Sequence, residues 1–299
     1  MAERSDLLQK RLSRLTRSFK AVQAGDVVAL HRARVASRRL RELVPLLELP
    51  ASRGRKIRRR LRKVTTRLGS VRELDVLMLL IDELHVARRP HRAALGHVAI
   101  TVSKERDETR KRLPDRLPKS DLRRAAKKLR RVVDELREGE QSARRPARAW
   151  RWALDARVAR RSARLREAME NAGTVYLPDR LHEVRLAVKK MRYTLELASE
   201  ISGIVTPADL RVLRRTQDLL GRLHDVELLV DRARQEQTSI SPPNLAAWGS
   251  LDGLIVSLED DCRRLHARYC RLAADLATIT DRLGGKRKSL EVSSARRVG

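Results

Sequence analysis

Residues 30–41 read LHRARVASRRLR, and residues 181–192 read LHEVRLAVKKMR. The two segments align at an offset of 151 residues, and every position that is basic in the second copy is also basic in the first. A second pair follows in the same order at an offset of 152 residues, with LGSVRELDVL at 68–77 and LGRLHDVELL at 220–229. Two ordered blocks about half a chain apart indicate a duplicated unit, and a repeat that occurs only twice favours a pseudo-twofold bundle over a solenoid.

Helix-forming residues surround these blocks. Leu, Ala, Arg and Glu dominate the sequence, and apolar residues recur every three or four positions. The alternating β-branched or aromatic runs that are typical of strands do not occur. Clusters of Pro, Gly and Ser predict breaks at residues 25–26, 50–54, 113–120, 139–146, 171–179, 203–207 and 238–244. The sequence therefore predicts an all-α fold.

The breaks and the repeat also predict how the chain is organised. We expect an N-terminal helix at 1–25 that packs on the first half, a first helical half at 26–145 and a second at 146–283. Residues 284–299 mix Gly, Lys, Arg and Ser with little apolar content. This composition predicts a disordered basic tail.

The charge of the chain points to a polyanionic partner. Its 299 residues include 68 Lys and Arg against 38 Asp and Glu, which gives a net charge of +30 at pH 7. Such a surplus destabilises a compact chain by self-repulsion unless a polyanion neutralises it. Of the basic residues, 55 are Arg, whose planar guanidinium group binds phosphate oxygens in pairs. Nucleic acid, an anionic membrane surface and a phosphate polymer all remain candidates on charge alone.

Other features narrow the class of protein. No apolar run approaches the roughly 20 residues of a membrane span, and the opening MAERSDLLQK has no apolar segment of a secretory signal. The two cysteines, Cys262 and Cys270, are too few for a cysteine-based metal site and are consistent with a reducing compartment. We therefore expect a cytoplasmic protein without a metal.

No catalytic motif is present. None of the seven histidines forms H-x-x-x-H or H-E-x-x-H, and the phosphate-binding loop G-x-x-x-x-G-K-[ST] does not occur. His224 stands beside Asp225, but we expect this pair to lie at a helix start rather than to perform acid–base chemistry. The sequence predicts a protein that is not an enzyme and needs no cofactor.

The first block predicts a basic helical stripe in each half. Within a helix, residues spaced by three and four lie on one face. The first basic stripe consists of His31, Arg34, Arg38 and Arg41, and the second basic stripe of His182, Arg185, Lys189 and Arg192. Like charges at these spacings cost about 0.2–0.5 kcal/mol per pair in an isolated helix. Because both halves carry this unfavourable pattern, we interpret the stripes as binding surfaces rather than as ordinary solvated faces.

The second block adds a basic helix and a pair of acids. Three of its positions are basic in both halves: Arg59 and Arg211, Arg62 and Arg214, and Lys63 and Arg215. The Leu-Gly pairs at 68–69 and 220–221 are typical of a helix end with Gly in the left-handed conformation. The acids Glu73 and Asp225 then fall in the first turn of the next helix. Alternatively, they hold basic side chains of the stripes in position.

Together the two blocks resemble the CHAD domain, the conserved histidine α-helical domain. The pattern is H-x-x-R-x-x-x-[KR]-[KR]-x-R, then a basic helix with L-G, then an acid four residues after the Gly, and it occurs twice. The resemblance covers about residues 5–282. It implies two pseudo-symmetric four-helix bundles around a central basic cavity, binding of inorganic polyphosphate, and association with polyphosphate granules. The chain lacks the E-x-E-x-K signature of the CYTH domain, so it resembles a stand-alone member.

The resemblance also implies a set of ligand residues. The polyphosphate-binding residues that we expect are His31, Arg34, Arg38, Arg39, Arg41, Arg59, Lys63, His182, Arg185, Lys189, Lys190, Arg192, Tyr193, Arg211, Arg214 and Arg215, with Glu73 and Asp225 behind them. The first half departs from the family pattern at two positions. Glu42 stands where the second half has Tyr193, and Glu73 stands where the family usually has Asp. Pro45 should end or kink the first stripe helix.

The aromatic content separates the candidate polyanions. Only 2% of the residues are aromatic. Single-stranded nucleic-acid binders stack bases on aromatic side chains, at about 1–3 kcal/mol per base, whereas polyphosphate has no bases. Nucleic acid stays the alternative ligand because its phosphates also attract cations. A membrane-surface role ranks below both, since the stripes lack flanking Trp or Phe on an apolar face.

Overall fold

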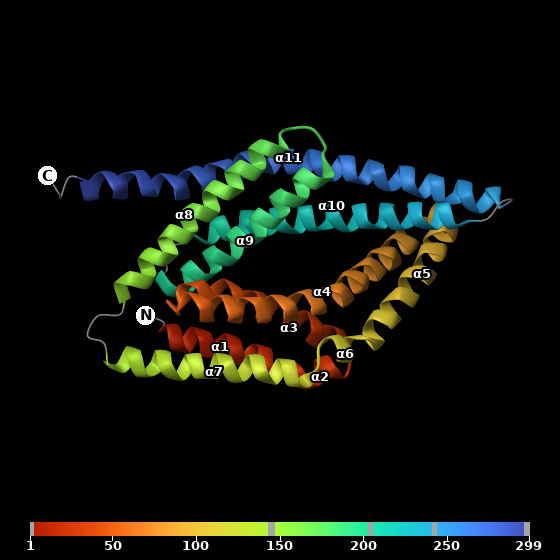
Figure 1. The fold of residues 1–299 in the computed structure, drawn as a ribbon. Helices are drawn as coiled ribbons and strands as arrows, with labels where there is room; N and C mark the ends of the chain where they lie inside the picture. The colour runs from red at the N-terminus through yellow and green to blue at the C-terminus, as the bar shows by residue number, and fades with distance from the viewer. Residues whose placement is uncertain (1–2, 143–146, 203–205, 241–243, 296–299) are drawn as a thin grey trace. The chain divides into compact units, whose positions relative to one another are not determined.

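Long helices separated by short breaks make up the protein (Figure 1). The structure is a computed structural model that describes residues 3–142, 147–202, 206–240 and 244–295. Across these ranges the secondary structure is helical and contains no strand. The all-α prediction is therefore confirmed.

The chain divides into two units, Met1–Trp150 and Arg151–Gly299. The helices of the first unit are α1 (Arg4–Arg17), α2 (Phe19–Gln23), α3 (Val27–Leu43), α4 (Ala51–Ala87), α5 (Arg92–Lys111), α6 (Leu113–Arg116) and α7 (Lys119–Ser142), with short 3₁₀ turns at Val44–Leu46 and Arg89–His91. The second unit holds most of α8 (Ala147–Ala172) together with α9 (Pro178–Ser202), α10 (Pro207–Ser239) and α11 (Leu245–Ala295).

In the first unit, α3 packs between α1 and α4. The apolar stripe of α1 buries Leu8, Leu12 and Leu15 almost completely. At the start of α3, the Asp26 carboxylate accepts a hydrogen bond from the backbone N–H of Ala29 at 2.5 Å, which caps the helix. The helix ends at Leu43 because Pro45, in the following 3₁₀ turn, cannot continue it, as the sequence predicts.

In the second unit, α10 packs against both α9 and α11. Val188 and Met191 from α9, Leu220 from α10 and Leu276 from α11 belong to one buried apolar cluster. The hydroxyl of Ser162 on α8 donates a buried hydrogen bond to the carbonyl of Thr280 on α11 at 2.7 Å, which joins the first and last helices of this unit.

Two sequence predictions about helix ends are wrong. The Leu-Gly pairs do not end helices, because α4 runs through Gly69 and α10 runs through Gly221. Glu73 and Asp225 accordingly lie in helix interiors and not in first turns. Conversely, the break between α4 and α5 at Arg88–His91, which contains Pro90, is not among the predicted breaks.

The segment predicted to be a disordered tail, residues 284–299, overlaps the last helix. The last helix, α11, continues to Ala295, and residues 296–299 lie outside the described residues. Lys, Arg, Leu and Glu occupy much of 286–291, and these residues have high helix propensity.

Candidate functional site

The first basic stripe lies along α3, on the side that meets α4. His31 is exposed, whereas Arg34, Arg38 and Arg41 are half-buried. The guanidinium of Arg34 lies over Gly69 of α4, where an added Cβ would stand 3.7 Å from its Cζ, Nε and Nη2 atoms. This distance is an ordinary van der Waals contact, so the Arg34 guanidinium lies directly over position 69 and only a side chain larger than alanine would displace it.

A buried hydroxyl pair holds α3 and α4 together beneath this stripe. The hydroxyls of Ser37 and Thr65 lie 2.9 Å apart. Ser37 is the neighbour of Arg38, and Thr65 also donates to the Leu61 carbonyl at 2.7 Å. Since buried hydroxyls need partners, this contact helps to fix the position of α3 on α4.

The second basic stripe lies along α9, where His182, Arg185, Lys189 and Arg192 are all half-buried. Its last member is held within the protein. The Nε of Arg192 donates to the Gln217 side chain of α10 at 2.9 Å, and its Nη1 donates to Glu196. The guanidinium carbon also stands 4.6 Å from the centre of the Tyr193 ring. Arg192 and Tyr193 therefore form one positioned group.

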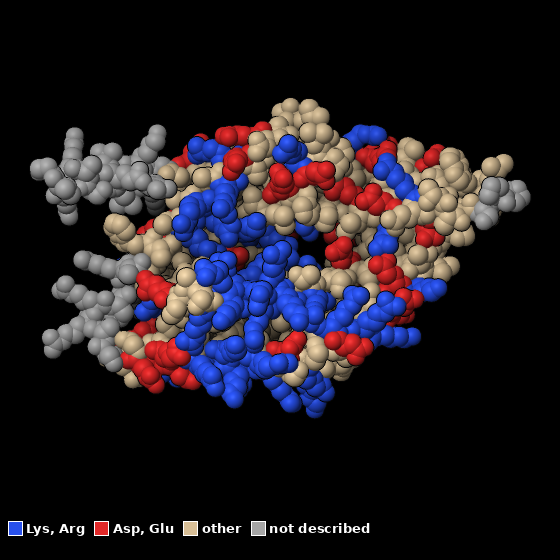
Figure 2. All heavy atoms as spheres, viewed as in Figure 1, with Lys and Arg blue, Asp and Glu red and all other residues tan. Residues whose placement is uncertain are grey.

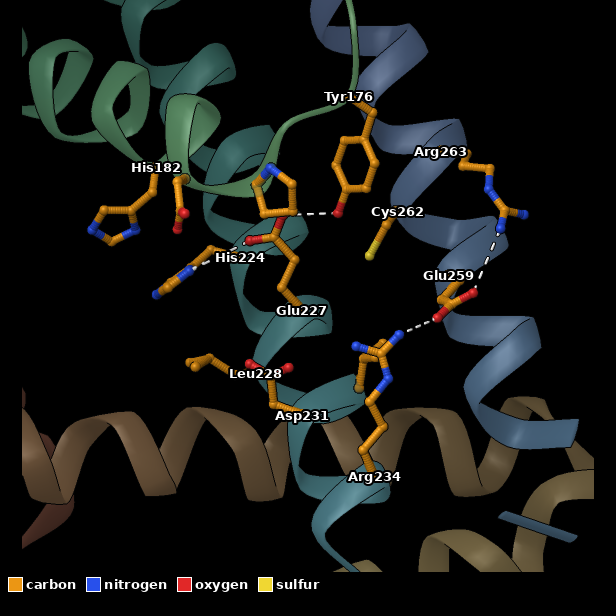
Figure 3. Close-up of a pocket in the computed structure, with 13 residues that line it drawn as sticks. Tyr176, His182, His224, Glu227, Leu228, Asp231, Arg234, Glu259, Cys262 and Arg263 are labelled. Carbon is orange, nitrogen blue, oxygen red and sulfur yellow. Dashed lines mark hydrogen bonds and ion pairs between the residues drawn. The ribbon is translucent and has the colours of Figure 1, made fainter. Parts of the chain in front are cut away.

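His182 faces a second histidine from the following helix. The ring centres of His182 and His224 are 4.8 Å apart, with the planes tilted by 55°. Behind His224, Glu227 accepts a hydrogen bond from the Tyr176 hydroxyl at 2.9 Å, and its other carboxylate oxygen lies 3.7 Å from His224 Nδ1 (Figure 3). The sequence pattern predicts a helix start at His224 and does not predict this contact. The place of His224 in the second repeated block is a signal that points to the residue.

The electrostatic surroundings keep the two stripe histidines uncharged. Partial desolvation of its ring lowers the pKa of His31 most, followed by the charges of Arg72, Arg34 and Arg38. Burial likewise lowers the pKa of His182 most, followed by His224 and Arg185, while Glu227 opposes the shift. Because the ordinary value is 6.5, both side chains are neutral at pH 7.

A pocket of about 370 Å³ opens beside His182 and His224 (Figure 3). Four carboxylates line it, from Asp179, Glu227, Asp231 and Glu259, and both Arg234 and Arg263 are ion-paired with Glu259. Cys262 in its wall is buried, and burial raises the pKa of the thiol to about 11. The pocket is thus unsuited to a polyanion, and its thiol is protonated at neutral pH.

Additional cations extend over the helices that follow the stripes. Arg59, Arg62 and Lys63 on α4 are exposed, and Figure 2 shows Lys and Arg gathered over this part of the first unit. Lys63 lies 3.6 Å from Asp121 of α7. The corresponding residues of α10 are Arg211, Arg214 and Arg215, which are also exposed.

Two predicted ligands lie away from the stripes. Arg39 lines a groove between α1 and α3, and Lys190 lines a groove between α8 and α9. Both follow a stripe residue by one position, which turns the side chain about 100° around the helix. Of the two expected acids, Glu73 is exposed and Asp225 is half-buried.

Neither a metal cluster nor a membrane span is found in the described part of the chain. No three His, Cys, Asp or Glu residues there are placed to hold a metal ion. No helix in those ranges is long and apolar enough to cross a bilayer.

Comparison with known proteins identifies the family. The model of the CHAD domain matches residues 6–234. The protein belongs to the CHAD domain family. A crystal structure of the CHAD domain from the plant Ricinus communis is similar, with a TM-score of 0.59 and 23% sequence identity over 93% of this chain and 89% of that one. Comparison with curated protein sequences finds no match. The CHAD family is associated with polyphosphate binding.

Proposed function

We propose that this CHAD protein binds inorganic polyphosphate through its two basic stripes. The observation that carries the proposal is that each unit presents the same set of groups on one helix, namely a neutral histidine followed by three cations. Four groups at these spacings extend about 15 Å along a helix, so one stripe contacts several successive phosphates.

The chemistry of the stripes suits a condensed phosphate chain. Arg presents paired N–H donors to phosphate oxygens, and Lys189 adds a compact charge. A neutral imidazole donates one N–H without adding to the repulsion among the cations. In the proposal, both stripes and the exposed cations of α4 and α10 face one central cavity, and the protein binds its ligand without cleaving it.

Nucleic acid is the alternative ligand. The Tyr193 ring is occupied by Arg192, and the exposed Trp152 lies on α8, outside the stripes. Since base stacking needs a free aromatic face, the stripes favour a polymer without bases. We further propose that the protein is cytoplasmic and associates with polyphosphate granules.

Competition binding tests the ligand. Labelled long-chain polyphosphate is titrated into the protein at fixed salt, with RNA and DNA as competitors at equal phosphate concentration. We expect polyphosphate to displace both nucleic acids. If RNA or DNA displaces polyphosphate instead, the alternative function is correct.

Salt dependence and variants test the stripes. If about ten cations are neutralised, the slope of log K against log salt is near −7, from roughly 0.7 per phosphate. The variants R34A/R38A and R185A/K189A should each weaken binding and flatten this slope. The control R112A/R116A removes two exposed arginines outside the stripes and should change binding much less.

A further inference from the structure

The first unit contains a basic groove beside the first stripe, on another face of α3. It has a volume of about 700 Å³ and lies between α1, α2 and α3. Its described lining includes five arginines, which are Arg11, Arg14, Arg17, Arg32 and Arg39. The carboxylate in this lining is that of Asp26, which already accepts the hydrogen bond that caps α3. The groove is therefore strongly positive.

The wall of the groove is built from a buried guanidinium group. Arg11 is only 5% exposed, and its Nη1 donates to the main-chain carbonyl of Arg39 at 3.3 Å, which ties α1 to α3. By contrast, Arg14, Arg17 and Arg32 are exposed. Within the described residues these three have no carboxylate at ion-pair distance. Their charges are thus available to an external anion.

The second unit provides an internal comparison. Its groove between α8 and α9 has a volume of about 300 Å³ and is lined by residues at the corresponding positions. Arg161 and Arg164 correspond to Arg11 and Arg14 at an offset of 150 residues, and Lys190 corresponds to Arg39 at an offset of 151.

Two positions differ in charge between the grooves. Glu167 stands where the first groove has Arg17, and Glu183 stands where it has Arg32. Glu183 also lies 3.7 Å from Arg180. Carboxylates thus offset the cations of the second groove, whereas arginines add to those of the first. Like charges destabilise a folded chain by self-repulsion, and an anionic ligand in the first groove would relieve this repulsion.

We infer that the α1–α3 groove is a second phosphate-binding surface, which holds the part of a polyphosphate chain that continues past His31 from the first stripe. His31 lines the groove and is also the first residue of that stripe, so the two surfaces are continuous on α3. The described lining of the groove contains no Phe, Tyr or Trp on which a base would stack. The inference rests on the proposed function and adds a surface to it.

Exchanging the differing charges tests the inference. R17A/R32A removes two groove contacts, and R17E/R32E gives the first groove the charges of the second. Binding of long-chain polyphosphate is measured by titration across a salt series. For R17A/R32A we expect about tenfold weaker binding near physiological salt and a slope smaller by about 1.4, since each lost phosphate contact removes roughly 0.7. R17E/R32E should weaken binding further, and E167R/E183R should strengthen it.

Controls separate the possible failures. R112A/R116A removes the same number of exposed charges from the same unit. If its loss equals that of R17A/R32A, the effect is one of net charge and the inference is overturned. A second outcome also overturns the inference: R17A/R32A binds polyphosphate as tightly as wild type, whereas R34A/R38A binds it less tightly. In that case the proposed function still stands. If wild type does not bind polyphosphate at all, the proposed function itself fails. Circular dichroism of each variant checks that it is folded.

Discussion

The ring of His182 on α9 lies 4.8 Å from the ring of His224 on α10. In the first unit, the residue aligned with His224 is Arg72 of α4, and its charge helps to lower the pKa of His31. In both units, therefore, a basic group from the next helix disfavours protonation of the stripe histidine. The two units use different side chains for this effect, which adds to the larger effect of desolvation on the pKa of each histidine.

Mild acid should destabilise the ligand-free protein. The pKa values of His31 and His182 lie below their ordinary value of 6.5 in the folded chain. The unfolded chain therefore takes up protons at these sites first, and their effect on stability is absent above pH 6.5 and grows as pH falls toward the folded-state pKa values. The denaturation midpoint in urea, measured at about pH 7.5 and 5.5, should fall at the lower pH.

The double variant H31Q/H182Q should lose less stability between these two pH values than wild type does. H97Q, which replaces an exposed histidine on α5, serves as the matched control and should behave as wild type. An equal loss in wild type and in H31Q/H182Q would show that other groups control the acid response.

Replacing Gly221 by Ala should stabilise the second unit. Gly221 lies inside α10, and in the described part of the chain no heavy atom outside its chain neighbours and its own helix backbone lies within 4 Å of the position that a Cβ would take. Glycine in a helix interior costs about 0.5–1 kcal/mol relative to alanine, so G221A should raise the urea midpoint. Were Gly221 a left-handed helix end, the same substitution would lower the midpoint, so the measurement distinguishes the two structures.

At Gly69, alanine should also be accepted, because its Cβ would only contact Arg34 at 3.7 Å. G69L should instead displace the Arg34 guanidinium and weaken polyphosphate binding. A G69L protein that binds as tightly as G69A would contradict the placement of the Arg34 guanidinium over Gly69.

The Leu-Gly pairs show where sequence reasoning fails. Glycine after an apolar residue is typical of a helix end, but long-range packing of α4 and α10 overrides this local preference. The helical class, the breaks at 25–26 and 171–179 and the spacing of the two stripes were predictable because they depend on local sequence, whereas the predicted break at 50–54 is helical from Ala51 and those at 139–146, 203–207 and 238–244 lie partly outside the described residues. The contact of His182 with His224 and the grooves beside Arg39 and Lys190 depend on how neighbouring helices pack, which spacing along one helix does not determine.

The buried hydroxyl pair makes a separate prediction for stability. S37A removes the Ser37 hydroxyl from its 2.9 Å contact with Thr65, and we expect a loss of about 1 kcal/mol in the free energy of unfolding of the first unit. The cost is moderate because Thr65 keeps its bond to the Leu61 carbonyl. S70A provides the control, since Ser70 is exposed and donates only to the Arg67 carbonyl of its own helix. Equal urea midpoints for S37A and S70A would contradict a role for the pair in holding α3 on α4.

Neutralising Glu196 should strengthen polyphosphate binding. Its carboxylate accepts a hydrogen bond from Arg192 at the end of the second stripe and lies 3.7 Å from Arg214. It therefore competes with a phosphate for both cations, and E196Q removes the competing charge while it keeps an acceptor for Arg192. We expect tighter binding at low salt and a slope that is steeper by about 0.7 for each cation released. E170Q changes an exposed carboxylate on α8 and should have little effect. Weaker binding by E196Q would contradict this prediction. It would mean that the Glu196 charge is needed to position Arg192 for the ligand.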